Sequence, residues 1–382
     1  MNDQVVVRGH VPALDGVRGL AILLVFLFHS MNGNIESVGW FSWIATRAVA
    51  MGWTGVDLFF VLSGYLITRS LWPGRGAANY YRVFYGRRAL RIFPLYYAVL
   101  IGVLMVAAWR HAPYSFDTQI LFWLNLSNLA TAFAPSLIGS LSSFWSLAIE
   151  EQFYFIWPSI LRHINEKYLV RISITLILIP LGLRNLPTIP HLLMRWPDLV
   201  YRLTFFRVDT LAAGALLAFV TLKHPEALRH RATIRAMFWG SGLLYGLLCF
   251  AKQPSHLHVV RFGYTLLLVC FTSLVALSLS GSGPLTAIFS NKWLRRMGDY
   301  SYCFYLLHIF PIIYLIHRPW IRAAVTSRLH LSVNLVAVLI ALAQFGVTFA
   351  LCALSYHFIE HPLSKLKKHF KFRRSNENVM HA

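Results

Sequence analysis

Charged residues are scarce in this sequence, and acids are the smaller share of them. Asp, Glu, Lys and Arg together make up 13% of the 382 residues, whereas about 25% is usual in a soluble protein. Apolar residues account for 57%, and apolar runs of roughly 18 residues recur along the whole chain. These runs leave no polar faces for water, so a soluble multi-domain protein is excluded. The pattern is typical of an all-α, polytopic integral membrane protein.

The sequence also lacks the motifs of several enzyme classes. It has no HExxH, no GxGxxG after a strand pattern and no GxSxG, which disfavours metalloenzymes, dinucleotide enzymes and serine hydrolases. We expect no metal site and no permanently bound cofactor. Thiol chemistry is equally poorly represented, because the few cysteines lie inside apolar runs without CxxC spacing and are interpreted as small apolar residues. These cysteines are Cys249, Cys270, Cys303 and Cys352.

The formal net charge is +21, because 35 Lys and Arg residues outnumber 14 Asp and Glu residues. The basic residues lie in short loops between apolar runs, so we expect them to contact the lipid bilayer rather than nucleic acid. Most of them fall on one side if the N-terminus is cytoplasmic. We therefore expect a multi-pass protein of the inner or plasma membrane with both termini in the cytoplasm.

The apolar runs predict about ten transmembrane helices within one membrane domain that covers residues 1–382. Its core is expected at 10–362, followed by a basic cytoplasmic tail at 363–382. The segment 118–133 contains two Asn residues and is expected to be re-entrant or interfacial. The predicted spans are 14–32, 54–71, 92–109, 144–161, 169–184, 203–222, 234–251, 261–280, 300–317 and 332–359.

The first apolar stretch carries one Arg and one His. Arg18 and His29 are 11 residues apart. On a helix this spacing places them roughly 20° apart around the axis and roughly 16 Å apart along it, hence on one stripe. They are either a snorkelling pair of interface anchors or functional groups, because ionisable residues within a membrane are costly and usually have a role.

The most unusual stretch is SFWSLAIEEQFYFIWP, residues 143–158. It places Glu150 and Glu151 inside an aromatic-rich apolar run, and two carboxylates there are hard to explain by packing. Adjacent side chains on a helix point about 100° apart, so at most one of the two Glu residues can face the stripe that Trp145 and Ser146 occupy. We favour Glu150 as functional, because it lies four residues after Ser146 and so on its face. We expect Glu151 to pair with a nearby Arg.

Other polar groups have two interpretations each. Arg87, Arg88 and Arg91 are either basic anchors or a clamp for phosphate oxygens, to which Arg is well suited. Asp57 and Ser63 interrupt another apolar run; we expect Asp57 near the outer boundary and Ser63 in helix packing.

Two further features stay open. Arg207 and Asp209 are expected to form a local ion pair or a loop anchor at the mouth of a span. His308 is either a second functional histidine or a satisfied core histidine.

These blocks together resemble the integral-membrane acyltransferase 3 family, the O-antigen and polysaccharide O-acetylases and their relatives. The resemblance runs in order through nearly the whole chain. One departure is Pro311, which lies three residues after His308 where a spacing of two is more typical of the family. We expect no fused extracytoplasmic esterase-like domain of the kind that some members carry. The matching blocks are LDGVRGLAILLVFLFH, GVDLFFVLSGYLIT, RRALRIFPLYY, FWSLAIEEQFYFIWP, FRVDTLAAGALLA, SYCFYLLH and FIEHP.

The resemblance implies transfer of an acyl group, commonly acetyl, from cytoplasmic acyl-CoA to a hydroxyl of an extracytoplasmic carbohydrate or related acceptor. It implies His29 as general base, Arg18 as the group that positions the donor, and Glu150 as a residue that orients His29 or binds the acceptor. The donor phosphates would be held by Arg87, Arg88 and Arg91. The expected substrate-binding residues are Trp145, Ser146, Asp57 and Ser63.

The main alternative is a transporter or flippase for lipid-linked sugars that uses the same intramembrane charges. The absence of an evident inverted repeat counts against it. The acceptor, the acyl chain length and the oligomeric state stay open.

Overall fold

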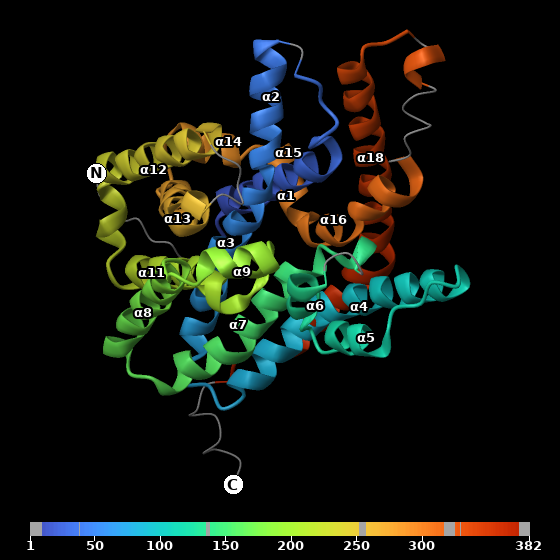
Figure 1. Cartoon of the computed structure of the whole chain (residues 1–382). Helices are drawn as coiled ribbons and strands as arrows, with labels where there is room; N and C mark the ends of the chain where they lie inside the picture. The colour runs from blue at the N-terminus through green and yellow to red at the C-terminus, as the bar shows by residue number, and fades with distance from the viewer. Residues whose placement is uncertain are drawn as a thin grey trace. The chain divides into compact units, whose positions relative to one another are not determined.

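The computed structural model describes residues 10–37, 39–134, 138–251, 257–316, 325–328 and 330–373. Within these ranges the chain is helical and has no β-strand, which confirms the predicted all-α class (Figure 1). The last nine residues of the predicted basic tail, 374–382, lie outside the described residues. The chain divides into two compact units. The first contains the described residues up to Phe59 and those of Leu228–Leu354, and the second contains Phe60–Ala227 and the described residues from Ser355 onward.

In the described ranges, seven helical segments are long and apolar enough to cross a membrane, so a multi-pass membrane protein is confirmed and ten is an approximate number. Glu166–Arg184 and Ile189–Arg195, bent by 74°, make an eighth if they form one broken span. Ser301–Ile313 is a shorter apolar helix. The predicted span 144–161 is a helix of sufficient length, but Glu150, Glu151 and Gln152 make it less apolar than the seven. The seven segments are Pro12–Met31, Trp40–Gly74, Tyr80–Trp109, Thr204–Lys223, Arg231–Phe250, Val259–Leu279 and Val333–His369.

The first unit is built around helix α1 (Pro12–Met31), and its α12 and α13 lie side by side (Figure 1). The glycines of LDGVRGL let α1 approach neighbouring backbone closely, because a Cβ at Gly16 would overlap the carbonyl of Phe289 and one at Gly19 the carbonyl of Leu294. The other elements are α2 (Trp40–Ala50), η1 (Met51–Thr54), the start of α3 (Gly55–Leu71), α12 (Arg231–Ala251), η6 (Val259–Gly263), α13 (Tyr264–Leu279), α14 (Pro284–Phe289), α15 (Lys292–Asp299), α16 (Ser301–Leu307), η7 (Pro311–Ile316) and α18 (Val333–Ser355).

The second unit contains the rest of α3 and the helices that follow it. Gly64 of α3 and Gly214 of α11 let these two helices meet at backbone distance, since an added Cβ would overlap the carbonyl of Leu211 or Val61. The segment expected to be re-entrant or interfacial forms two short helices, α5 (Phe116–Trp123) and α6 (Ser127–Phe133). The remaining elements are η2 (Trp72–Gly74), α4 (Tyr80–Trp109), η4 (Gly139–Leu141), α7 (Phe144–His163), α8 (Glu166–Arg184), α9 (Ile189–Arg195), α10 (Leu199–Arg202), α11 (Thr204–Lys223), η5 (Pro225–Arg229), η8 (Tyr356–Glu360), α19 (His361–Lys365) and η9 (Leu366–His369).

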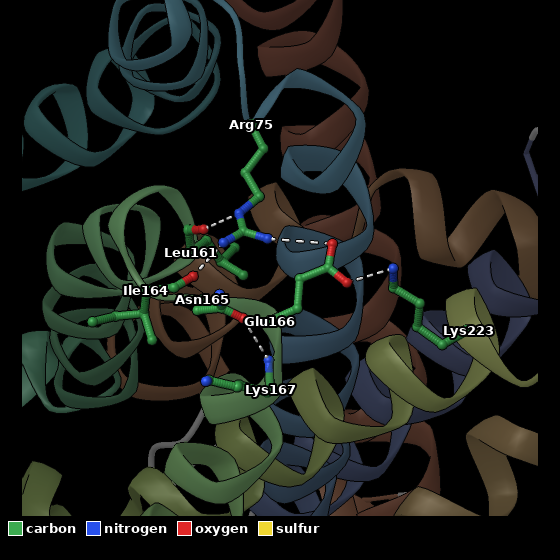
Figure 2. Close-up of polar contacts among 7 residues, drawn as sticks. All are labelled: Arg75, Leu161, Ile164, Asn165, Glu166, Lys167 and Lys223. Carbon is green, nitrogen blue, oxygen red and sulfur yellow. Dashed lines mark hydrogen bonds and ion pairs between the residues drawn. The ribbon is translucent and has the colours of Figure 1, made fainter.

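The turn between α7 and α8 is held by a series of hydrogen bonds and ion pairs, which Figure 2 shows. Arg75 donates hydrogen bonds to the carbonyl oxygens of Leu161 and Ile164, and so caps the C-terminal end of α7, where the helix dipole favours a cation. Its guanidinium also lies 3.6 Å from Glu166 Oε1, and Glu166 Oε2 lies 2.6 Å from Lys223 Nζ. This chain of contacts links α7, α8 and α11 at one end, which fixes the helix that carries Glu150 and Glu151.

A fully buried ion pair joins α8 to α11. Arg184 Nη2 lies 2.8 Å from Asp209 Oδ2, and the two side chains are 0% and 2% exposed. The expected local pairing of Arg207 with Asp209 is therefore wrong. Asp209 lies two residues beyond Arg207 on the same helix and points to a different neighbour, while the buried Arg207 guanidinium lies 5.0 Å from the ring centroid of Tyr201.

Candidate active site

Helix α1 carries Arg18 and His29 without a break between them, as the spacing predicts. Pro12 suits the start of the helix, and the Asp15 carboxylate in the first turn agrees with the helix dipole. His29 lies in the last turn. Arg18 is half-buried and forms no ion pair within the part of the chain that the structure describes. His29 is half-buried too, and its Nδ1 lies 2.9 Å from the carbonyl oxygen of Val25.

The structure brings His308, whose role the sequence left open, to His29. His308 Nε2 lies 3.2 Å from His29 Nδ1, and the two ring centroids are 5.0 Å apart. His308 is fully buried and follows the last residue of α16. The α-helical pattern is interrupted at His308, and the π-helical segment η7 begins at Pro311. The unusual spacing of that proline thus coincides with irregular helix geometry, and such geometry is frequent at functional sites.

Basic residues that the sequence analysis did not single out lie on α15. This helix packs on the half of α1 that carries Arg18, because Gly19 meets the backbone of Leu294 and Gly298. Arg295 is half-buried, and Arg296 is exposed. The sequence feature that could have indicated these residues is the run KWLRRMGD. Without knowledge of its contact with α1, this run is interpreted as an ordinary basic loop.

Asp57 is fully buried, so its carboxylate is not exposed to solvent. Its expected position near the outer boundary of the membrane stays a prediction. It interacts electrostatically with the hydroxyl of Tyr245 on α12. Nearby, Trp53 packs edge-to-face on Tyr264, with ring centroids 5.8 Å apart.

In the second unit, Glu150 has two hydroxyl partners. Ser63 donates to Glu150 Oε1 at 2.9 Å, and Tyr154 donates to Oε2 at 3.3 Å. Two residues expected in the site, Ser63 and Glu150, are therefore in direct contact across α3 and α7. The helix packing expected at this part of α3 is carried by the adjacent Gly64.

Arg88 pairs with Glu151, which confirms that Glu151 has an Arg partner. Arg88 Nε and Nη2 lie 3.1 Å and 2.9 Å from Glu151 Oε1. The guanidinium carbon also lies 3.2 Å from the ring centroid of Tyr154, a cation–π contact. Arg88 thus links α4 to α7, and its charge is already balanced inside the protein.

The other two members of the arginine trio face the C-terminal segment. Arg87 Nε donates to the carbonyl oxygen of Phe370 at 2.7 Å. Lys367 interacts electrostatically with both Arg87 and Arg91. The Phe370 ring lies on Gly86, where a Cβ would overlap it. A cluster of cations therefore forms where the C-terminal segment crosses the first turns of α4.

Trp145 and Ser146 are both buried near the start of α7. Trp145 packs against Tyr201 and Phe60, with ring centroids 4.6 Å and 6.2 Å apart. Arg207 lies against the same Tyr201 and Phe60 rings. The role of Trp145 and Ser146 in substrate binding stays a prediction.

Within the described residues, no group of three or more His, Cys, Asp or Glu side chains is placed to hold a metal ion. All four cysteines lie in the described ranges, where they are buried and form no disulfide. Two polar centres stand out instead: the two histidines in the first unit, and Ser63, Glu150, Glu151 and Arg88 in the second. The predicted action of Glu150 on His29 stays a prediction.

Long apolar helices with a few buried charges define a polytopic membrane protein that carries polar centres within its helices. A family model described as an acyltransferase domain matches residues 11–357, which is most of the chain, and the chain belongs to this family. The resemblance seen in the sequence blocks is thereby confirmed.

Curated relatives cover nearly all of this chain. Peptidoglycan O-acetyltransferase OatA of Listeria monocytogenes is 31% identical over 94% of the chain and 56% of its own length. Putative peptidoglycan O-acetyltransferase YrhL of Bacillus subtilis is 30% identical over 93% of the chain and 55% of its length. O-acetyltransferase OatA of Staphylococcus aureus is 26% identical over 93% and 57%. The chain thus spans a little over half the length of these relatives, and no solved structure matches it.

Proposed function

We propose that this protein is a membrane O-acyltransferase that moves an acetyl group from acetyl-CoA to a hydroxyl of a carbohydrate. The observation that carries the proposal is an unbroken intramembrane helix with Arg18 and His29 in a chain of the acyltransferase family. The relatives are named O-acetyltransferases, two of them of peptidoglycan, so a peptidoglycan-type glycan is the first acceptor to test.

In this proposal His29 is the general base. Its neutral imidazole takes the proton of the acceptor hydroxyl while the oxygen attacks the thioester carbonyl. The C–S bond then breaks, and the protonated His29 returns the proton to the leaving thiolate, so that the products are the ester and free CoA. Proton transfer of this kind contributes about 10²–10⁴-fold to a rate. Arg18, half-buried on the same helix, positions the donor.

In this proposal the donor is held at the cation-bearing N-terminal end of α4. Acyl-CoA carries several phosphates, and guanidinium groups bind phosphate oxygens through paired hydrogen bonds. Arg87 and Arg91 supply this charge next to Lys367, while Arg88 contributes through its link to Glu151. We assign this end and both termini to the cytoplasm, and the His29 end to the outer side, because acyl-CoA is cytoplasmic.

The polar groups not yet assigned a role are proposed to bind the carbohydrate acceptor. The Glu150 carboxylate accepts hydrogen bonds and suits sugar hydroxyls. Ser63 holds its orientation at 2.9 Å. Trp145, Ser146 and Asp57 complete the proposed set.

A deletion strain tests the proposal. The strain would be complemented with wild type, His29→Ala or His224→Ala, and its glycans would be measured by mass spectrometry. His224 is the matched control, because it is an exposed histidine that contacts Glu226. We expect wild type and His224→Ala to restore one acetyl increment and His29→Ala to be inserted but inactive. Near-normal acetylation by His29→Ala would refute the base assignment.

The donor site has its own test in purified protein. We expect Arg91→Ala and Arg88→Ala to raise the KM for acetyl-CoA more than the KM for the acceptor. An unchanged KM for acetyl-CoA in Arg91→Ala would remove the phosphate clamp from the proposal.

A further inference from the structure

Two aromatic side chains attach the C-terminal segment 366–373 to the region where α4 begins. The ring of Phe370 lies on Gly86 of α4, and the ring of Phe372 lies on Gly74 of η2. A Cβ at either glycine would overlap the ring that lies on it. The two rings therefore occupy places that only glycine leaves open.

The backbone of the same segment is held by Asn79, which directly precedes α4. Asn79 Nδ2 donates to the carbonyl oxygen of Lys371 at 2.8 Å, and Asn79 Oδ1 accepts from the backbone N–H of Arg373 at 3.0 Å. One side chain thus satisfies two backbone groups and fixes the register of the segment against α4. These contacts are made by residues beyond 357, where the match to the acyltransferase family ends.

The segment also determines how Arg87 is held. Arg87 Nε donates to the carbonyl oxygen of Phe370 at 2.7 Å. A carbonyl group is neutral, so this bond orients the guanidinium and leaves its positive charge in place, whereas the charge of Arg88 is balanced by Glu151. Because Arg87 is exposed, its charge is accessible to a ligand.

A further cation reaches α4 on this segment. Lys367 is half-buried and lies three residues before Phe370. It interacts electrostatically with Arg87 and Arg91, and also with the carboxylate of Glu360. Cations that are brought together repel one another, so the attachment of the segment must hold Lys367 there against this repulsion. A phosphate group bound among these cations would relieve it.

We propose that the C-terminal segment 366–373 is part of the donor site, where Lys367 and Arg87 together bind a phosphate group of acyl-CoA. Phe370 and Phe372 are positioning residues, because they hold the segment and touch no substrate in this scheme. The inference rests on the proposed function and extends its donor site beyond the arginines of α4. The phosphate of an anionic lipid headgroup has the same chemistry, so the experiment includes both ligands.

Donor binding to purified protein in a neutral detergent tests the role of Lys367. Isothermal titration would give the Kd of CoA for wild type, Lys367→Met and Lys368→Met. Met keeps an unbranched apolar side chain without the charge, and Lys368 is the matched control because it is an exposed neighbour on the same segment. We expect Lys367→Met to raise the Kd about tenfold, the order of one hydrogen bond to a charged group, and Lys368→Met to stay within about twofold.

The outcomes of this titration separate the inference from the proposed function. An equal Kd in wild type and Lys367→Met would overturn the inference and leave the proposed function standing. The inference would also be overturned if Lys367→Met bound CoA normally but bound phosphatidylglycerol vesicles less than wild type does, because the phosphate would then belong to a lipid. No binding of CoA to wild type would refute the proposed function, and the inference with it.

The variant Gly86→Ala tests the attachment of the segment without changing a charge. Alanine favours a helix interior, so α4 persists while the new Cβ displaces the Phe370 ring. Gly102→Ala on the same helix is the matched control, because a Cβ there meets nothing. We expect Gly86→Ala to raise the KM for acetyl-CoA about tenfold at unchanged kcat, and to leave the KM for S-acetylpantetheine, which carries no phosphate, unchanged. An equal rise for both donors, or no rise for acetyl-CoA, would overturn the positioning role.

Discussion

Removing the Arg88 guanidinium should cost stability as well as donor affinity. Arg88 donates two hydrogen bonds to Glu151 Oε1, at 3.1 Å and 2.9 Å, and lies on the ring of Tyr154. Both charged side chains are only 16% exposed. Breaking a buried pair by removing one partner costs about 3–5 kcal/mol. The residual exposure lowers this, and we expect about 3 kcal/mol for Arg88→Ala.

The double variant Arg88→Leu/Glu151→Leu distinguishes the loss of the ion pair from the cost of leaving one buried charge without a partner. It leaves no unpaired buried charge, so we expect it to recover most of the lost stability. In a double-mutant cycle with alanine, the coupling energy should be about 2 kcal/mol, the size of a hydrogen bond to a charged group. Arg91→Ala is the matched control on the same helix, because Arg91 is exposed, and we expect it to cost less than about 1 kcal/mol.

The assay is reversible unfolding in mixed micelles by titration with SDS, followed by tryptophan fluorescence. The free energies of unfolding of wild type and of all these variants, including both single alanine variants and the double alanine variant of the cycle, would be compared under one condition. A cost below about 1 kcal/mol for Arg88→Ala would refute the link between α4 and α7 and leave Arg88 free to serve phosphate alone. If the double variant were as unstable as Arg88→Ala, the lost stability would not arise from a Glu151 carboxylate left buried without its partner.

Three further changes test the scaffold. Asp209→Asn should lose about 3–5 kcal/mol in the same titration, and replacing Arg184 and Asp209 together by Leu should restore most of it; equal stability of Asp209→Asn and wild type would contradict the buried pair. Gly19→Ala should express poorly in size-exclusion profiles, because its Cβ has no room, whereas Gly102→Ala, which meets nothing, should match wild type. Phe370→Ala should expose the basic C-terminal segment to trypsin, and unchanged cleavage would refute its attachment to α4.

Much of the fold could be predicted because a bilayer leaves few choices. Apolar runs of sufficient length must be helices, so the helical class and the positions of most spans followed from hydropathy. The broken helix after Glu166 and the two short helices within 118–133 were harder, because their bends depend on packing that no local pattern records.

The candidate site was only partly predictable. The stripe of Arg18 and His29 needs nothing but helical spacing, and Glu151 with an Arg partner follows from the cost of a buried carboxylate. The contact between His29 and His308 joins residues 279 positions apart and could not be read from spacing. Asp209 was assigned the wrong partner for the same reason: its arginine comes from another helix.

The central claim is that His29 performs the proton transfer, and acetyl transfer in proteoliposomes tests it most directly. Purified wild type or His29→Ala would be supplied with acetyl-CoA and a peptidoglycan-type oligosaccharide, and release of CoA thiol and acetylated glycan would be measured. The account predicts transfer by wild type and a loss of at least about 100-fold in His29→Ala, with acetyl-CoA binding retained. Transfer by His29→Ala at the wild-type rate would contradict it.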